Sequence, residues 1–180
     1  SHRHDDHLVF CAMIEGRSAI SAGDRASEEL AQGFCTFFGL SSGDTVHTVY
    51  EAHRPLRYVS IFLRRDRVQD VLGLDVNALP PIFRDYILER TPIGLRHVPL
   101  GSGASIAATQ AFECPYEGEL RRLHLMAKSI EIVCAVIHSY VEDNHADGPV
   151  LRRPDVEKVR LAKQIIGDDL DKPLRVAHLA

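Results

Sequence analysis

Short apolar runs separated by turn-forming residues fill the first third of the chain. The runs are rich in β-branched and aromatic residues, and glycine, aspartate or proline lies between one run and the next. Several strands of this length and spacing are typical of a small β-sandwich or barrel. The predicted strands are Leu8–Ile14, Arg17–Ser21, Gly33–Leu40, Thr45–Glu51 and Leu56–Leu63.

Helical spacing replaces this alternation further along the chain. Two short helices are predicted, over Asp66–Leu72 and Pro81–Glu89, and the prolines between them fit because proline is tolerated in a first helical turn. After the unassigned segment Thr91–Leu100, two further helices are predicted over Ser102–Phe112 and Tyr116–Glu142. Strands followed by helices indicate an α+β fold.

The longest predicted helix carries one continuous apolar stripe. The stripe is formed by Leu120, Leu123, Met126, Ile130, Val133, Ile137 and Tyr140. One interpretation is that it covers the β domain of its own chain. The other is that Ile132 and Val136 widen the stripe enough to meet a partner helix as well.

The end of the chain has the pattern of a DNA-binding motif. After the polar stretch Asp143–Pro149, the segment Asp155–Ala180 is predicted to form a helix, a turn and the start of a second helix. A helix-turn-helix also needs its recognition helix, so we expect that helix to lie beyond Ala180.

Composition narrows the functional classes. A formal charge of -4 over 180 residues argues against nucleic-acid binding by the whole surface. The four cysteines stand far apart in apolar contexts, which predicts reduced, buried thiols. Without a long apolar run or a signal-peptide core, the sequence predicts a soluble cytoplasmic protein.

Histidines are numerous, but their spacing does not predict a metal site. Among the ten, His47 and His53 stand apart in a β-rich stretch, and His4 and His7 belong to the terminus. Surface or hydrogen-bonded histidines are the better interpretation. The sequence also lacks the usual hydrolase, phosphate-loop and zinc-protease motifs, so neither an enzyme nor a bound cofactor is predicted.

A basic cluster, Arg64-Arg65-Asp66-Arg67, directly follows an apolar strand. Guanidinium groups bind phosphates in a bidentate manner and also recognise guanine, whose Watson–Crick edge Asp66 can bind. The alternative is a solvated cluster in which Asp66 caps the next helix and the arginines pair with Asp70 and Asp75.

Two stretches resemble the AraC family of transcription regulators, namely CPYEGELRRLHLMAKSIEIVCAVI at 114–137 and DVEKVRLAKQIIGDDLDKPLRVAHLA at 155–180. Within the first, several residues fall where siderophore-sensing members have similar ones: Pro115, Tyr116, Gly118, Leu120, Arg121, Arg122, Leu123 and Lys128. The resemblance implies a cupin-like β-barrel that binds an effector, helices that form a homodimer, and helix-turn-helix units that bind promoter DNA. The implied domains are a sensing barrel at 8–100, dimerisation helices at 101–145, a linker at 146–153 and the start of a helix-turn-helix at 154–180.

The chain is also similar to cyclic-di-GMP-responsive AraC-like activators of exopolysaccharide genes. That similarity implies that the arginine cluster binds cyclic di-GMP and that a second polar segment closes over it. The implied ligand-binding residues are Arg64, Arg65, Asp66, Arg67, Arg90, Thr91 and Arg96, with Arg17 and Arg57 of lower rank.

Three alternatives remain open from the sequence. A siderophore, sugar or aromatic metabolite can be held inside the barrel by Phe37, Phe38 and Tyr50. The chain can be a cupin-like metalloenzyme fused to helices, or a dimerisation module that senses nothing.

Overall fold

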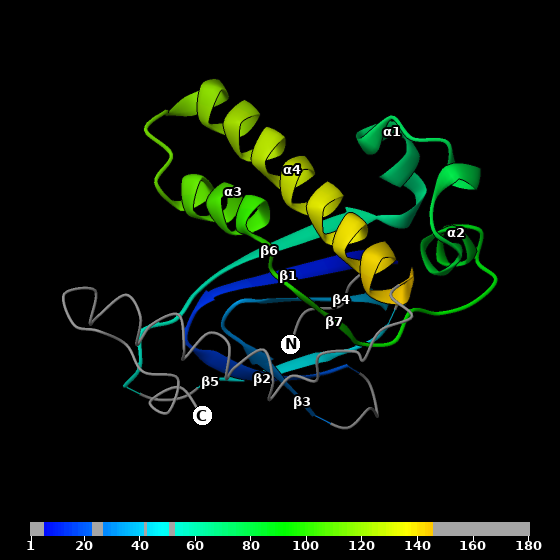
Figure 1. Ribbon diagram of the computed structural model, residues 1–180, viewed down its shortest axis with the longest axis horizontal. Coiled ribbons are helices and arrows are strands. Elements are labelled where there is room, and N and C mark those ends of the chain that lie inside the picture. The colour runs from blue at the N-terminus through cyan, green and yellow to red at the C-terminus, as the bar shows by residue number, and fades with distance from the viewer. Residues whose placement is uncertain (1–5, 23–26, 42, 51–52, 146–180) are drawn as a thin grey trace, which may run out of the picture. The chain divides into compact units, whose positions relative to one another are not determined.

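A computed structural model of the protein describes residues 6–22, 27–41, 43–50 and 53–145 (Figure 1). Its strands are β1 (His7–Glu15), β2 (Arg17–Ala22), β3 (Glu28–Ala31), β4 (Phe34–Leu40), β5 (Val46–Tyr50), β6 (Arg57–Arg64) and β7 (Arg96–Pro99). Its helices are α1 (Val68–Leu72), α2 (Pro81–Ile87), α3 (Ser102–Phe112) and α4 (Gly118–His145), with short 3₁₀ turns η1 (Arg65–Arg67) and η2 (Val76–Ala78).

The strands form two antiparallel sheets. One has the order β6-β1-β4-β7 and the other the order β3-β2-β5. The predicted α+β class and all five predicted strands are confirmed, each within two residues of its predicted ends. The described strands do not close into the predicted barrel, because no backbone ladder joins the two sheets.

The chain passes from one sheet to the other at Gly16, between β1 and β2. Gly16 has φ +88°, a left-handed conformation that L side chains rarely adopt. A Cβ atom placed there would lie 2.4 Å from the carbonyl oxygen of Pro55, where β6 is about to begin. Glycine is therefore required at this point both by conformation and by space.

Strand β1 is buried on both of its faces. Side chains alternate along a strand, so Leu8, Phe10 and Ala12 contribute to one apolar cluster. Val9 and Cys11, on the opposite face of the strand, contribute to a second cluster. The first cluster lies beneath the helices and the second between the sheets, which gives the domain three layers.

Helices α3 and α4 lie across the first sheet (Figure 1). Small residues of α3, such as Ala107 and Ala108, let that helix approach the sheet closely. On α4, Ile132, Val133 and Val136 are fully buried in the same cluster. Ile132 and Val136, which one interpretation assigned to a partner helix, therefore pack within their own domain.

The first half of the apolar stripe behaves differently. The side chains of Leu120, Leu123 and Met126 are 62%, 47% and 47% exposed. The stripe is therefore divided, with its C-terminal half packed on the sheet and its N-terminal half facing outward.

Two strands were not predicted, β3 and β7. β3 contains two glutamates, which are depleted in strands, and β7 ends in proline. Each pairs with one neighbour only, β3 with β2 and β7 with β4. Edge positions of this kind depend on the strand alongside, and the local sequence does not carry that information.

The remaining predictions have mixed outcomes. Cys11 and Cys35 are buried as expected, but Cys114 is partly exposed and Cys134 exposed; all four are free thiols. Residues 6–142 belong to one compact unit, and the predicted linker at 146–153 and helix-turn-helix start at 154–180 lie outside the described residues. No described helix has the length and apolarity needed to cross a bilayer.

We predict that Gly16→Ala destabilises the domain more than Gly33→Ala. Both glycines have positive φ, but a Cβ atom on Gly33 would meet nothing within 4 Å. Gly33→Ala is expected to cost about 1–2 kcal/mol from conformation alone, and Gly16→Ala about 1–3 kcal/mol more because of the contact with Pro55. Urea unfolding of both variants measures the difference. Equal losses would show that the chain at Gly16 has room to shift.

Candidate functional site

A cavity of about 460 Å³ lies between the two sheets. We call it the inter-sheet cavity. It is lined by Val9, Cys11, Ser18, Ile20, Leu30, Phe38, Leu40, Val46, Thr48, Tyr50, Tyr58, Ser60 and Phe62. These residues come from both sheets, so the cavity exists only because the chain turns back on itself at Gly16.

Strand alternation decides which predicted residues reach this cavity. Phe38 and Tyr50 line it, as the metabolite alternative required. Phe37 does not line the cavity, because its side chain lies on the other face of β4, in the apolar cluster beneath the helices. There its ring packs against Phe83 at 5.0 Å between centroids and edge-on against Tyr140 at 5.4 Å.

The polar groups of the inter-sheet cavity are uncharged. Cys11 Sγ and Ser60 Oγ lie 3.4 Å apart on neighbouring strands, and burial raises the pKa of the Cys11 thiol. Ser18 is buried in the opposite sheet, and Thr48 is half-buried. Among the described residues that line the cavity, none carries an ionised side chain at neutral pH.

Two tyrosines bridge the sheets at the rim of the inter-sheet cavity. The hydroxyl oxygens of Tyr50 on β5 and Tyr58 on β6 lie 3.1 Å apart, and the rings stack at 6.4 Å with an interplanar angle of 24°. Both strands are at sheet edges. The hydrogen bond to Tyr50, followed by burial, raises the pKa of Tyr58 to about 12.

A different side-chain bridge joins the sheets through β3, the other edge of the three-stranded sheet. Thr36 Oγ1 on β4 lies 2.7 Å from His97 Nδ1 on β7, and His97 Nε2 lies 2.6 Å from Glu28 Oε2 on β3. Thr36 is almost completely buried. A neutral His97 satisfies both neighbours by accepting from the Thr36 hydroxyl and donating to the Glu28 carboxylate.

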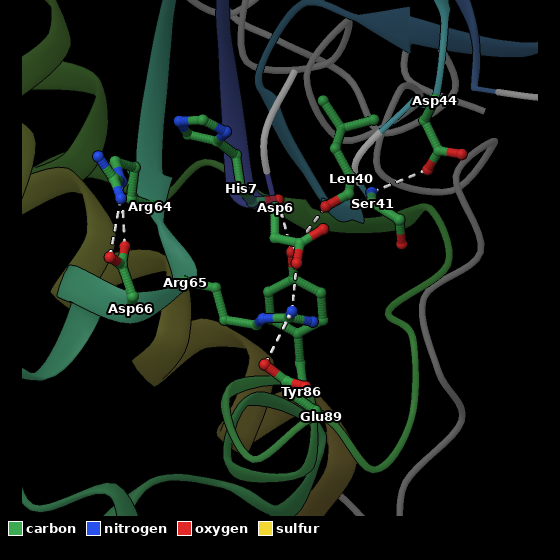
Figure 2. A network of polar contacts seen from close by, with 10 residues as sticks. All are labelled: Asp6, His7, Leu40, Ser41, Asp44, Arg64, Arg65, Asp66, Tyr86 and Glu89. Atoms are coloured by element: carbon green, nitrogen blue, oxygen red, sulfur yellow. Dashed lines mark hydrogen bonds and ion pairs between the residues drawn. The ribbon is translucent and has the colours of Figure 1, made fainter. Parts of the chain in front are cut away.

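The predicted arginine cluster lies at the opposite end of β6 from Arg57. Arg64 binds Asp66 in a bidentate manner, at 3.0 Å from Nε and 2.8 Å from Nη2 (Figure 2). These hydrogen bonds lower the pKa of Asp66. Asp66 therefore binds Arg64 and does not cap α1, while Arg67 pairs with Asp70 at 3.5 Å, one of the predicted pairings.

Arg65 is held by side chains of its own domain. Its guanidinium forms ion pairs with Asp6 and, at 3.0 Å, with Glu89, and lies over the ring of Tyr86 at 5.7 Å (Figure 2). Tyr86 in turn donates to the carbonyl oxygens of His7 at 2.8 Å and Leu40 at 3.0 Å. Burial raises the pKa of Tyr86 to about 12, so the phenol stays neutral and ties α2 to the sheet.

The other predicted ligand residues are dispersed. A hollow of about 260 Å³, the arginine hollow, is lined by Asp6, Arg64, Arg65, Asp66, Ile87 and Glu89. Of the remaining candidates, Arg67, Arg90, Thr91 and Arg96 do not line it. Arg90 pairs with Asp85 at 3.6 Å, and Arg96 donates to the Leu95 carbonyl oxygen at 3.1 Å.

The two arginines of lower rank also have other partners. Arg17 forms an ion pair with Glu29 at 3.6 Å, and the Arg57 guanidinium lies 5.0 Å from the centre of the Phe112 ring.

A third hollow lies between β6 and the helices. It measures about 260 Å³, and we call it the β6–α4 groove. Its lining is Ser60, Ile61, Phe62, Leu63, Val71, Leu72, Met126, Ser129, Ile130 and Val133. Ser60 and Phe62 therefore line both this groove and the inter-sheet cavity.

Histidine, cysteine and acidic side chains do not gather into a metal-binding group within the described part of the chain. His47 and His53 are both exposed.

Comparison with protein families identifies a regulatory domain. The family model of the regulatory protein PchR N-terminal domain matches residues 1–151. The search of curated proteins returned no match.

Proposed function

The chain belongs to the family of PchR regulatory N-terminal domains, a regulatory domain of AraC-type transcription regulators, and on that premise we propose that it senses a small effector in its inter-sheet cavity. The cavity volume of about 460 Å³ supports this proposal, since pockets for small ligands measure about 300–1,000 Å³ and are mostly apolar. An uncharged lining favours an aromatic or apolar metabolite. The domain then acts by binding, without catalysis.

A route for the signal runs through β6. The inter-sheet cavity and the β6–α4 groove share Ser60 and Phe62, so a ligand that shifts β6 at these residues also changes the wall of the groove beside α4. Binding alters the regulator only to the extent that the ligand prefers one arrangement of the helices. Promoter DNA is the proposed partner of the segment from residue 154 onward.

The first prediction is that a bulky residue in the inter-sheet cavity blocks an apolar probe. N-phenyl-1-naphthylamine, an uncharged dye that fluoresces in apolar surroundings, is expected to bind the protein with one-to-one stoichiometry. Thr48→Phe fills the cavity and is expected to weaken binding at least about tenfold, because a tight site does not accept added volume. Thr48→Val keeps the volume and serves as the control. Equal affinity in all three proteins would reject the cavity as the binding site.

The outward half of the α4 stripe is the proposed homodimer contact. Leu120, Leu123 and Met126 are too exposed to be explained by packing within the domain. A helix pair formed through these residues joins two copies of the chain, each with its own segment from residue 154 onward.

We predict that Leu123→Glu shifts the protein toward the monomer, because a buried unpaired carboxylate opposes association. Sedimentation velocity measures the change, and Arg121→Glu, an exposed residue outside the stripe on the same helix, is the control. A monomer already present in the unchanged protein at high concentration would contradict the dimer.

Cyclic di-GMP at the arginine cluster, with control of exopolysaccharide genes, is the second candidate. Its support is the arginine hollow, which Arg64, the last residue of β6, and Arg65, the first residue of η1, both line. Three carboxylates also line that hollow, and each guanidinium already binds at least one of them. A phosphate has to displace those carboxylates, so the cavity ranks first.

The prediction for this candidate uses the carboxylates. Arg64→Ala and Arg65→Ala, at the two arginines that line the arginine hollow, are expected to abolish cyclic di-GMP binding in calorimetry. Glu89→Gln is expected to strengthen binding several-fold because Arg65 loses a competing partner. Arg122→Ala, at an exposed arginine of α4 paired with Glu119, is the control. If both arginine variants bind as well as the unchanged protein, the arginine hollow is not the site.

A further inference from the structure

We infer that the Tyr50–Tyr58 pair recognises a hydroxyl group on an uncharged aromatic ligand of the inter-sheet cavity, exchanging its own hydrogen bond for bonds to that group. This inference rests on the proposed function and gives the effector a chemical class. It also assigns the two tyrosines a role in selecting it.

The lining of the cavity selects against ionised groups. Its polar members are hydroxyls and one thiol, whose pKa is raised by burial, and the described lining residues include no cation or anion. Moving a carboxylate, sulfonate or phosphate from water into such a site costs several kcal/mol when no counter-charge is present. The site therefore favours neutral ligands.

The tyrosine pair has unused hydrogen-bonding capacity. One phenol hydroxyl donates to the other across 3.1 Å, so the second O–H proton is not used in this bond. At the rim, Tyr50 is exposed and Tyr58 is half-buried. Tyr58 stays neutral at physiological pH because its pKa is about 12. A ligand hydroxyl that accepts from one phenol and donates to the other replaces the bond that it breaks.

The position of the tyrosine pair favours it as the point where a ligand enters the inter-sheet cavity. Tyr50 is 50% exposed and belongs to edge strand β5, and Tyr58 belongs to edge strand β6. The described residues of these two strands share no backbone ladder. Across β3, by contrast, the sheets are joined through His97, whose ring lies 2.6 Å from Glu28 Oε2 and 2.7 Å from the hydroxyl of the buried Thr36. Parting two phenols breaks one hydrogen bond, whereas parting the sheets across β3 disturbs a chain of three hydrogen-bonded residues.

Ring geometry adds the aromatic preference. The two phenol rings are nearly parallel at the rim, and Phe38 and Phe62 also line the cavity. Aromatic ligands gain stabilisation from stacked or edge-on contacts beyond that of the area that they bury. A flat ligand with one hydroxyl at its edge meets both requirements.

The first experiment compares two dyes of the same skeleton. N-phenyl-1-naphthylamine is uncharged, and 8-anilino-1-naphthalenesulfonate adds a sulfonate. Binding to the inter-sheet cavity is taken, for each dye, as the binding that is lost in the Thr48→Phe variant. We expect this cavity binding to be at least tenfold tighter for the uncharged dye. Equal cavity binding of the sulfonate would overturn the neutral-ligand class.

The second experiment isolates the hydroxyl. Naphthalene and 2-naphthol each displace N-phenyl-1-naphthylamine, and the ratio of their dissociation constants is measured in Tyr50→Phe, Tyr58→Phe and the double variant. We expect the preference for 2-naphthol to fall about five- to tenfold in the double variant relative to the unchanged protein. Tyr116→Phe, at an exposed tyrosine before α4 that does not line the cavity, is the control and is expected to leave the ratio unchanged.

The outcomes separate the two levels of the proposal. If the dye fails to bind, or binds regardless of Thr48→Phe, the inter-sheet cavity is not a ligand site and the proposed function fails. If the dye binds in the cavity but the ratio is the same with and without the two phenol hydroxyls, only the tyrosine role is wrong.

Discussion

Strand β1 has no face left for solvent, and the arrangement of the domain follows from that constraint. Its odd and even positions supply two separate apolar clusters, so one layer has to cover each side. Helices α3 and α4 cover one side, and the three-stranded sheet covers the other after the chain turns at Gly16. The inter-sheet cavity is the part of the second interface that side chains leave unfilled. Fold and candidate site thus have the same physical origin.

Charge is distributed according to this layering. The interior between the sheets holds neutral hydroxyls and a thiol, whereas the guanidinium groups gather at the strand end, where Asp6, Asp66, Asp70 and Glu89 neutralise them. Arg65 has only 19% of its side chain exposed, and its two carboxylate partners allow that degree of burial. Its contact with Tyr86 fastens α2 to the sheet. Arg65, one of the arginines that suggest an anion site in the sequence, therefore has a structural role.

The periodicity of apolar residues was sufficient to predict the strands and helices that have one regularly buried face or are buried throughout. The runs at β1 and β4 and the stripe of α4 predict their elements within a few residues, because each packs on a continuous apolar surface. β3 and β7 escaped prediction since their pairing depends on a neighbouring strand and not on their own composition. Within the site, Phe38 and Tyr50 were predictable as apolar barrel residues, but Phe37 was misplaced because the register decides which of two adjacent phenylalanines faces the cavity. The Thr36–His97–Glu28 bridge carries no signal in sequence, since its members are far apart along the chain.

Under the proposed function, the division of the α4 stripe connects ligand binding to dimer assembly. Its C-terminal half is fixed to the sheet by Val133 and Tyr140, while Met126, in the outward half, lines the β6–α4 groove. Edge strand β6 forms the other wall of that groove and also one wall of the inter-sheet cavity. An edge strand has a ladder on one side only, so it adjusts at lower cost than β1, which is held by ladders on both sides. Under the proposed function, a ligand that displaces β6 therefore acts on the outward half of α4 while the buried half keeps the helix anchored, and this is the property required of an element that reports occupancy to a partner.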